Sequence, residues 1–150
     1  RSSAAGLRSG FVAGDPALLA SFARLRSYGA AVQPLPIMAA ATALWQDEEH
    51  VIANRALYQA KFDLAERCLG GILDYLRPDG GFFLWLDVGD GEAVTRRLWA
   101  EAAIKVLPGA YLGRPDAIGH NPGERAIRVA LVHDLETTEA ALSRLVEQLA

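Results

Sequence analysis

The chain has 150 residues, of which 51% are apolar, and its formal net charge is −3 at pH 7. This composition suits one folded domain with an apolar core and excludes a disordered chain. The basic residues form no stripe that would bind nucleic acid, and no apolar run is long enough to span a membrane. The single Cys68 excludes an internal disulfide and fits a reducing compartment. We therefore expect a soluble cytoplasmic protein that binds a small molecule or another protein.

The first third of the sequence predicts one strand followed by two helices. The small and apolar run at 9–13 is typical of a buried strand. Asp15 as N-cap and Pro16 at the first helical position predict a helix over 16–28. Two prolines exclude a helix at the entry of the next segment, and the alanine-rich run 37–46 is expected to be helical. A lone strand leaves its backbone groups unpaired, so we expect the rest of its sheet to lie in sequence upstream of this chain.

The remaining sequence predicts a long helix and then a small sheet with further helices. An acidic start and apolar residues at helical spacing indicate the long helix within 47–73, with one apolar stripe made of Leu57, Leu64, Cys68 and Ile72. The elements after it are expected in the order strand 82–88, helix 90–103, strand 104–108, a turn-rich loop, strand 125–132 and a C-terminal helix capped by Asp134. This order favours an α/β protein of the α+β type, with helices on one side of a small, mainly antiparallel sheet.

Arg8 is the first candidate for a binding role. It lies in the segment Ala-Gly-Leu-Arg-Ser-Gly, between small residues and directly before the expected strand. A guanidinium held over a tight turn, with backbone amides nearby, suits an anion such as a phosphate. The alternative is a solvated or ion-paired arginine of the kind that is common on protein surfaces.

Arg128 is the second candidate, because it alternates with Ile127 and Val129 in an otherwise apolar strand. A full charge in such a strand is costly unless it has a partner. One interpretation is a carboxylate elsewhere in the fold. The other is a bidentate clamp on the carboxylate of a substrate, and the residues alone leave both open.

The histidines give no catalytic or metal site. His133 and Asp134 are adjacent after the last strand, but neighbouring residues at a strand end point in opposite directions, and Asp134 is better suited to cap the following helix. His50 and His120 lack partners at ligand spacing, so no metal site is predicted. The aromatic residues of the expected strand 82–88 are assigned to the core.

Four motifs resemble, in the right order, the C-terminal part of the fold-type I pyridoxal-phosphate aminotransferases, in the aspartate aminotransferase superfamily. They are GLRSG, RPDGGFFLWLDV, VLPGAYLG and RAIRVALV. The first is similar to the family's Gly-x-Arg-x-Gly segment, whose arginine binds the cofactor phosphate. The last is similar to the strand that bears the family's carboxylate-binding arginine. The resemblance covers essentially the whole chain.

The resemblance implies that Arg8 binds the phosphate of pyridoxal 5′-phosphate and that Arg128 binds the substrate α-carboxylate. The family's cofactor-binding lysine follows Ser-x-Ser, and that lysine would stand immediately before Arg1. Lys61, expected at the surface of the long helix, and Lys105, expected in a short strand, do not follow such a motif. We therefore assign no catalytic residue to this chain and expect no activity from it alone.

The resemblance also implies a domain organisation and an assembly. Residues 1–45 are expected to be the remnant of a large cofactor-binding domain, and residues 46–150 to form the connecting helix and the small C-terminal domain. The parent enzyme would be a homodimer that transfers amino groups between glutamate or 2-oxoglutarate and another amino or keto acid. Pyridoxal phosphate would serve as the electron sink of that reaction.

Within the family, RSSAAGLRSGFVAGD together with NPGERAIRVALV is most similar to the succinyldiaminopimelate aminotransferases of bacterial lysine biosynthesis. Two alternatives stay open. One is a non-catalytic small-domain module that serves dimerisation or carboxylate binding. The other is a lyase of the same fold, because motifs that bind a cofactor do not determine which bond breaks. A coding sequence upstream of the chain that ends in Ser-x-Ser-Lys would favour the enzyme over the module.

Overall fold

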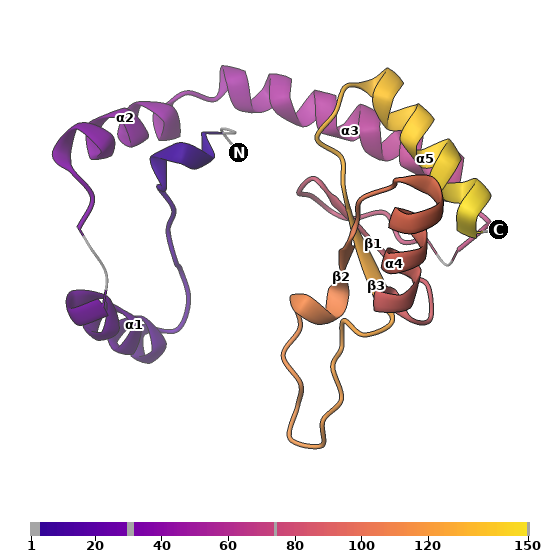
Figure 1. The fold of residues 1–150 in the computed structure, drawn as a ribbon. Helices are drawn as coiled ribbons and strands as arrows, with labels where there is room; N and C mark the ends of the chain where they lie inside the picture. Colours follow the sequence, from indigo (N-terminus) through magenta and orange to yellow (C-terminus); the bar gives the residue numbers. More distant parts are fainter. Residues whose placement is uncertain (1–3, 30–31, 74, 150) are drawn as a thin grey trace. The chain divides into compact units, whose positions relative to one another are not determined.

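A computed structural model describes residues 4–29, 32–73 and 75–149 of the chain. The chain divides into two compact units, Arg1–Arg55 and Ala56–Ala150. Figure 1 labels the main elements of each unit and colours them by their position in the sequence. The boundary between these units lies within helix α3 (Glu49–Leu69). The assignment of the two parts to a large and a small domain stays a prediction. Among the described residues, no helix is long and apolar enough to cross a membrane.

The first unit consists of the 3-10 helix η1 (Ala5–Leu7), the helices α1 (Pro16–Gly29) and α2 (Leu35–Gln46), and the first turns of α3. Asp15 caps α1, because its Oδ1 accepts hydrogen bonds from the backbone N–H groups of Ala17 and Leu18 at 2.8 and 3.1 Å. Helix α2 begins at Leu35, earlier than predicted. Pro36 lies in its first turn, where a missing N–H removes no intrahelical bond.

The strand predicted at 9–13 is not formed. Residues 9–13 adopt neither helix nor strand. A strand needs a neighbour with which to exchange backbone hydrogen bonds. The described residues of this unit form no strand that could serve as this neighbour. Phe11 is instead 76% exposed, and its ring meets that of Trp45 edge-on, with 5.4 Å between the centroids.

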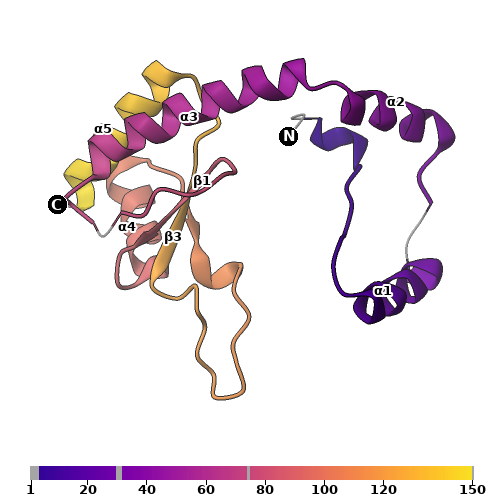
Figure 2. The same cartoon turned by 180° about the vertical axis from the view of Figure 1, so that it is seen from behind.

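The second unit contains a three-stranded antiparallel sheet, seen from two sides in Figures 1 and 2. Its strands are β1 (Phe83–Asp87), β2 (Leu107–Pro108) and β3 (Ala126–Ala130), in the spatial order β1-β3-β2. All three predicted strands are therefore present, although each is shorter than predicted. Leu84 and Leu86 of β1 and Ile127 of β3 are buried on one face, because side chains two residues apart in a strand point to the same side.

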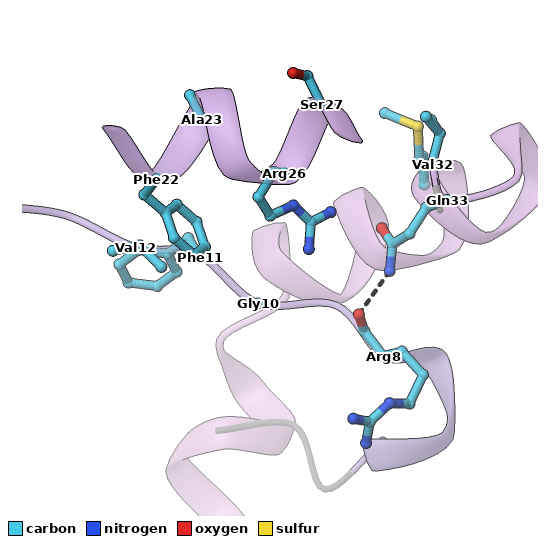
Figure 3. A pocket seen from close by; sticks show the side chains of 11 residues that line it. Arg8, Gly10, Phe11, Val12, Phe22, Ala23, Arg26, Ser27, Val32 and Gln33 are labelled. Atoms are coloured by element: carbon cyan, nitrogen blue, oxygen red, sulfur yellow. Dashed lines mark hydrogen bonds between the residues drawn. The ribbon is translucent and has the colours of Figure 1, made fainter. Parts of the chain in front are cut away.

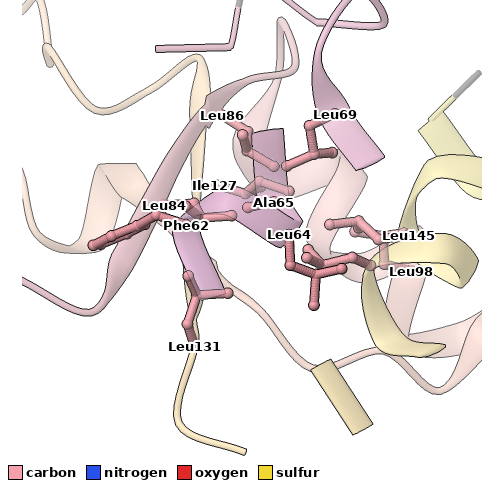
Figure 4. Packing of buried hydrophobic residues seen from close by; sticks show 11 residues of the cluster. Phe62, Leu64, Ala65, Leu69, Leu84, Leu86, Leu98, Ile127, Leu131 and Leu145 are labelled. Carbon is pink, nitrogen blue, oxygen red and sulfur yellow. The ribbon is translucent and has the colours of Figure 1, made fainter. Parts of the chain in front are cut away.

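Helices α4 (Gly91–Ala102) and α5 (Leu135–Leu149), together with the second half of α3, pack on the sheet. Asp90 and Asp134 cap α4 and α5, and each carboxylate accepts from the N–H three residues later, at 2.9 and 2.7 Å. Figure 4 shows the side chains of these helices and strands meeting in one apolar cluster. Its members are Phe62, Leu64, Ala65, Leu69, Leu84, Leu86, Leu98, Ile127, Leu131, Leu142 and Leu145. This architecture confirms the predicted fold class.

Helix α3 buries only part of the predicted stripe, since Leu64 is buried and Cys68 is half-buried against the apolar cluster. Leu57 and Ile72 belong to the predicted stripe, but both are exposed, and Ile72 lies beyond the end of the helix. The buried apolar residues in the second half of the helix are Phe62, Leu64, Ala65 and Leu69. A helix with apolar residues on several sides allows more than one stripe, and the position of the sheet decides which one is buried.

Lys61 is not at the helix surface, in contrast to the prediction. Only 9% of the residue is exposed. Its Nζ donates to the backbone carbonyl of Leu131 at 3.0 Å and lies 4.9 Å from the centroid of the Tyr58 ring. The N–H of Leu131 donates to the carbonyl of Phe82. Lys61 therefore satisfies a carbonyl just beyond the end of β3, and its methylene stem lets it do so within the core.

Candidate carboxylate and phosphate sites

Arg128 lies on the face of the sheet that points away from the apolar cluster. It is half-buried and stands directly opposite Trp85 in β1 and Leu107 in β2. Its guanidinium carbon lies 4.1 Å from the centroid of the Phe83 ring. Phe83 and Trp85 are two residues apart and so share this face of β1. The aromatic ring supports the flat side of the guanidinium by a cation–π contact and leaves the N–H groups at its edge for another partner.

No carboxylate of residues 4–29, 32–73 and 75–149 forms an ion pair with Arg128. Arg125, three residues earlier, does have such a partner. Its Nε and Nη2 donate to the two carboxylate oxygens of Asp87 at 2.9 and 3.0 Å, and these bonds hold the pKa of Asp87 below its ordinary value. The structural carboxylate that the sequence left open for Arg128 is thus not found among the described residues. The substrate-binding role of Arg128 stays a prediction.

The turn that leads into β3 is built by close backbone contacts. A Cβ atom added to Gly123 would lie only 2.3 Å from the carbonyl oxygen of Gly109, the first residue of the 3-10 helix η2 (Gly109–Tyr111). Asn121 closes the same turn, because its amide donates to a carbonyl in η2 and its Oδ1 accepts from the N–H of Gly123, both at 2.9 Å. These contacts hold the start of the strand that carries Arg128.

Arg8 ends η1 in the left-handed conformation, with φ of 54°. This conformation is uncommon for a residue with a side chain, and it forms the tight turn that the sequence suggested. Gln33 stabilises the turn from the segment before α2, because its Nε2 donates to the carbonyls of Leu7 and Arg8 at 3.1 and 2.7 Å. In Figure 3 the Arg8 side chain extends away from Gln33. It is exposed and has no ion pair with any described residue.

Arg8 lines a cavity of about 680 Å³ within the first unit. Arg26 lines the same cavity, and Figure 3 shows it extending from α1 toward the segment that carries Gly10. Phe11 and Phe22 supply apolar walls. Within the described ranges, no carboxylate neutralises either guanidinium. Two arginines beside an apolar wall suit a phosphorylated aromatic ring, so the residues present fit pyridoxal phosphate.

The histidines do not add a further site. The carboxylate of Asp134 accepts from the first turn of α5, and these hydrogen bonds hold its pKa below the ordinary value. His50 contacts Asp47 at 2.7 Å between Nδ1 and Oδ2, and this bond lowers the pKa of Asp47. In the part of the chain that the structure describes, no three His, Cys, Asp or Glu side chains gather as metal ligands.

Sequence reasoning missed two residues of these sites. Phe83 was assigned to the core, and its stacking on Arg128 depends on the register between β1 and β3, which local sequence does not encode. Arg26 lies near the end of α1, and no local signal in the sequence places it beside Arg8. Arg8 belongs to the first unit and Arg128 to the second, so the structure places each arginine only within its own unit.

The sequence profile of the family described as aminotransferase class I and II matches residues 2–145. The chain therefore belongs to this family. Among solved structures, an aminotransferase from Neisseria meningitidis is 46% identical, with a TM-score of 0.81, over 100% of this chain and 38% of that one. A probable N-succinyldiaminopimelate aminotransferase from Thermus thermophilus is 27% identical, with a TM-score of 0.74, over 97% of this chain and 39% of that one.

Curated relatives have several different substrates in their names. The 4-dedimethylamino-4-oxo-anhydrotetracycline transaminase OxyQ from Streptomyces rimosus is 32% identical over 97% of this chain. The arginine–pyruvate transaminase AruH from Pseudomonas aeruginosa is 34% identical over 93% of this chain. The chain spans 39% of the length of OxyQ and 36% of that of AruH.

Proposed function

We propose that the chain is the C-terminal part of a pyridoxal-phosphate-dependent aminotransferase, with residues 1–45 in the large domain and residues 46–150 in the connecting helix and small domain. Membership of the family and the likeness to a solved aminotransferase along the whole chain support this proposal. The observation that carries it is Arg128, a half-buried guanidinium that rests on an aromatic ring and has no carboxylate partner among the described residues.

In the proposed enzyme, Arg128 binds the α-carboxylate of the amino or keto acid through two parallel N–H···O bonds. The planar guanidinium of arginine can donate to both carboxylate oxygens at once. The ammonium group of a lysine lacks this planar pair of donors. Phe83 fixes the plane of the guanidinium, and the contact between Gly109 and Gly123 fixes the start of its strand. A carboxylate held in one orientation directs the substrate Cα–H bond, so this clamp contributes to rate by positioning.

Arg8 binds the cofactor phosphate in this proposal, with Arg26 beside it in the same cavity. Pyridoxal phosphate, when bound, supplies an electron sink for the negative charge that develops at the substrate Cα. The lysine that bonds to the cofactor is proposed to lie upstream of these residues. Lys61 is engaged within the core by the carbonyl of Leu131, and neither Lys61 nor Lys105 follows Ser-x-Ser.

The finer proposal is a cytoplasmic, homodimeric succinyldiaminopimelate aminotransferase of bacterial lysine biosynthesis. Its support is the similarity of the motifs around Arg8 and Arg128 and the name of the Thermus thermophilus neighbour. Glutamate is the proposed amino donor in the biosynthetic direction. The reverse reaction, from N-succinyldiaminopimelate to 2-oxoglutarate, provides the assay.

The test extends the reading frame upstream of Arg1 and compares the longer protein with the 150-residue chain. We expect Ser-x-Ser-Lys directly before Arg1. The longer protein should form glutamate from N-succinyldiaminopimelate and 2-oxoglutarate, whereas the chain alone should not. If glutamate formed only from other amino donors, the protein would still be an aminotransferase, but the assignment of N-succinyldiaminopimelate as its substrate would be wrong. Elimination products without glutamate would favour the lyase, and a start codon at this point would favour the small-domain module.

A further inference from the structure

A second cavity lies entirely within the unit Ala56–Ala150 and has a volume of about 360 Å³. Its walls are the segment Ala103–Val106 that leads into β2, the end of β3 with the residues that follow it, and one side of α5. Arg128 does not line this cavity. The volume is at the lower end of the range of roughly 300–1,000 Å³ that is typical of small-molecule sites.

The cavity arises because β2 is short. The ladder between β2 and β3 contains only the pairs Leu107↔Arg128 and Pro108↔Ile127. The residues before Leu107 therefore run beside the end of β3 without continuing the ladder, and α5 covers the space that remains. Thr138, on the first turns of α5, is buried at this wall, and its hydroxyl donates to the carbonyl of His133 at 3.4 Å.

The inner surface of the cavity is apolar. Leu131, Leu142 and Leu145 line it and belong to the main apolar cluster, where each is at most 2% exposed. Ile104 and Val106 line the opposite wall and are half-buried. A ligand with an aliphatic or aromatic body would remove this surface from water, which is the main favourable term for such sites.

The charged side chains of the cavity all have one sign. They are Lys105 and Arg144, and none of the described lining residues is acidic. Arg144 is held in place, because its Nη2 donates to the carbonyl of Ala102 at the end of α4. Lys105 is exposed and forms no ion pair with a described residue. Asp134, which follows His133 in the chain, is not part of the lining.

We propose that this cavity binds a small organic anion, with a carboxylate at the basic rim and an apolar body on the leucine floor. The site is separate from the carboxylate clamp proposed at Arg128 and does not depend on the proposed enzyme activity. The combination of an apolar interior with cationic groups and no acidic group selects an anionic amphiphile over a neutral or cationic molecule of the same shape.

The test uses 4-phenylbutyrate as the probe and the 150-residue chain labelled with nitrogen-15, followed by amide chemical shifts during titration. We expect saturable shifts at Lys105, Val106, His133 and Ala141, and weaker binding of the neutral 4-phenylbutanamide. Lys105→Gln should weaken binding about three- to fivefold, the scale of a solvent-accessible charge contact. Ala141→Glu, which adds a negative charge to an exposed position in the lining, should weaken it more.

Two variants separate this site from other basic surfaces. Arg114→Gln removes an exposed positive charge outside the cavity and should leave the affinity unchanged. Arg128→Gln should also leave it unchanged, because that side chain does not line the cavity. The proposal is overturned if shifts do not saturate, if the amide binds as tightly as the acid, or if Arg128→Gln removes binding while Lys105→Gln does not.

Discussion

Gly123→Ala is expected to destabilise the second unit by about 3 kcal/mol, the upper part of the usual cost of overpacking. The added Cβ would lie 2.3 Å from the carbonyl oxygen of Gly109 and 2.5 Å from its carbonyl carbon. Ordinary contacts of this kind begin near 3.4 Å, so one of the two backbone segments must move by about 1 Å. A flexible side chain could rotate away from the new Cβ at little cost. The atoms that it would meet here belong to the backbone of Gly109 and Ala110, which cannot rotate away.

Thermal unfolding followed by far-UV circular dichroism measures this effect. For a chain of this size, about 3 kcal/mol corresponds to a fall in Tm of about 6–12 °C. Gly80→Ala is the matched control, because a Cβ at Gly80 meets nothing within 4 Å and its φ is not positive. The control should leave Tm unchanged or raise it slightly. Equal Tm values for the two variants would refute the close contact that holds the start of β3.

Three further predictions concern single side chains. In the longer protein, Arg8→Ala should weaken the retention of pyridoxal phosphate about tenfold to a hundredfold, measured by equilibrium dialysis; unchanged retention would count against the phosphate assignment. Lys61→Met removes the side-chain donor to the carbonyl of Leu131. The free energy of unfolding, measured in urea, should fall by about 1–3 kcal/mol. A gain in stability would show that this hydrogen bond is dispensable. Asp134→Ala should lower Tm at pH 7. Because the folded-state pKa of Asp134 is depressed, the difference from wild type should shrink as the pH falls through that pKa, and a difference independent of pH would contradict the cap.

The elements that the sequence predicted well are those whose signals are local. The composition of 82–88 indicated a strand whose alternate residues form two faces, and Leu84 and Leu86 lie together on the buried face. Asp134 marked the start of α5, and its carboxylate accepts the expected hydrogen bond. A cap and a periodic face depend on residues within a turn or two of each other, so local sequence contains the information that they need.

The features that the sequence did not predict depend on partners distant in the chain. The run at 9–13 has the composition of a strand, but no described strand in its unit pairs with it. The sequence around Lys61 is typical of a surface lysine. Its burial depends on the carbonyl of Leu131, 70 residues later, which accepts its hydrogen bond. Phe83 and Arg128 meet only because the antiparallel register brings their strands together across a long connection.

The kinetics of Arg128→Lys in the longer protein test the central claim most directly. The variant keeps the charge but loses the bidentate fork, so KM should rise for amino donor and acceptor alike, and kcat/KM should fall about tenfold to a hundredfold. The content of pyridoxal phosphate should stay that of the wild type. Arg114→Lys, at an exposed position in the loop before β3, should leave both kinetic constants unchanged. If Arg128→Lys also left them unchanged, Arg128 would be a structural residue and the proposed carboxylate clamp would be wrong.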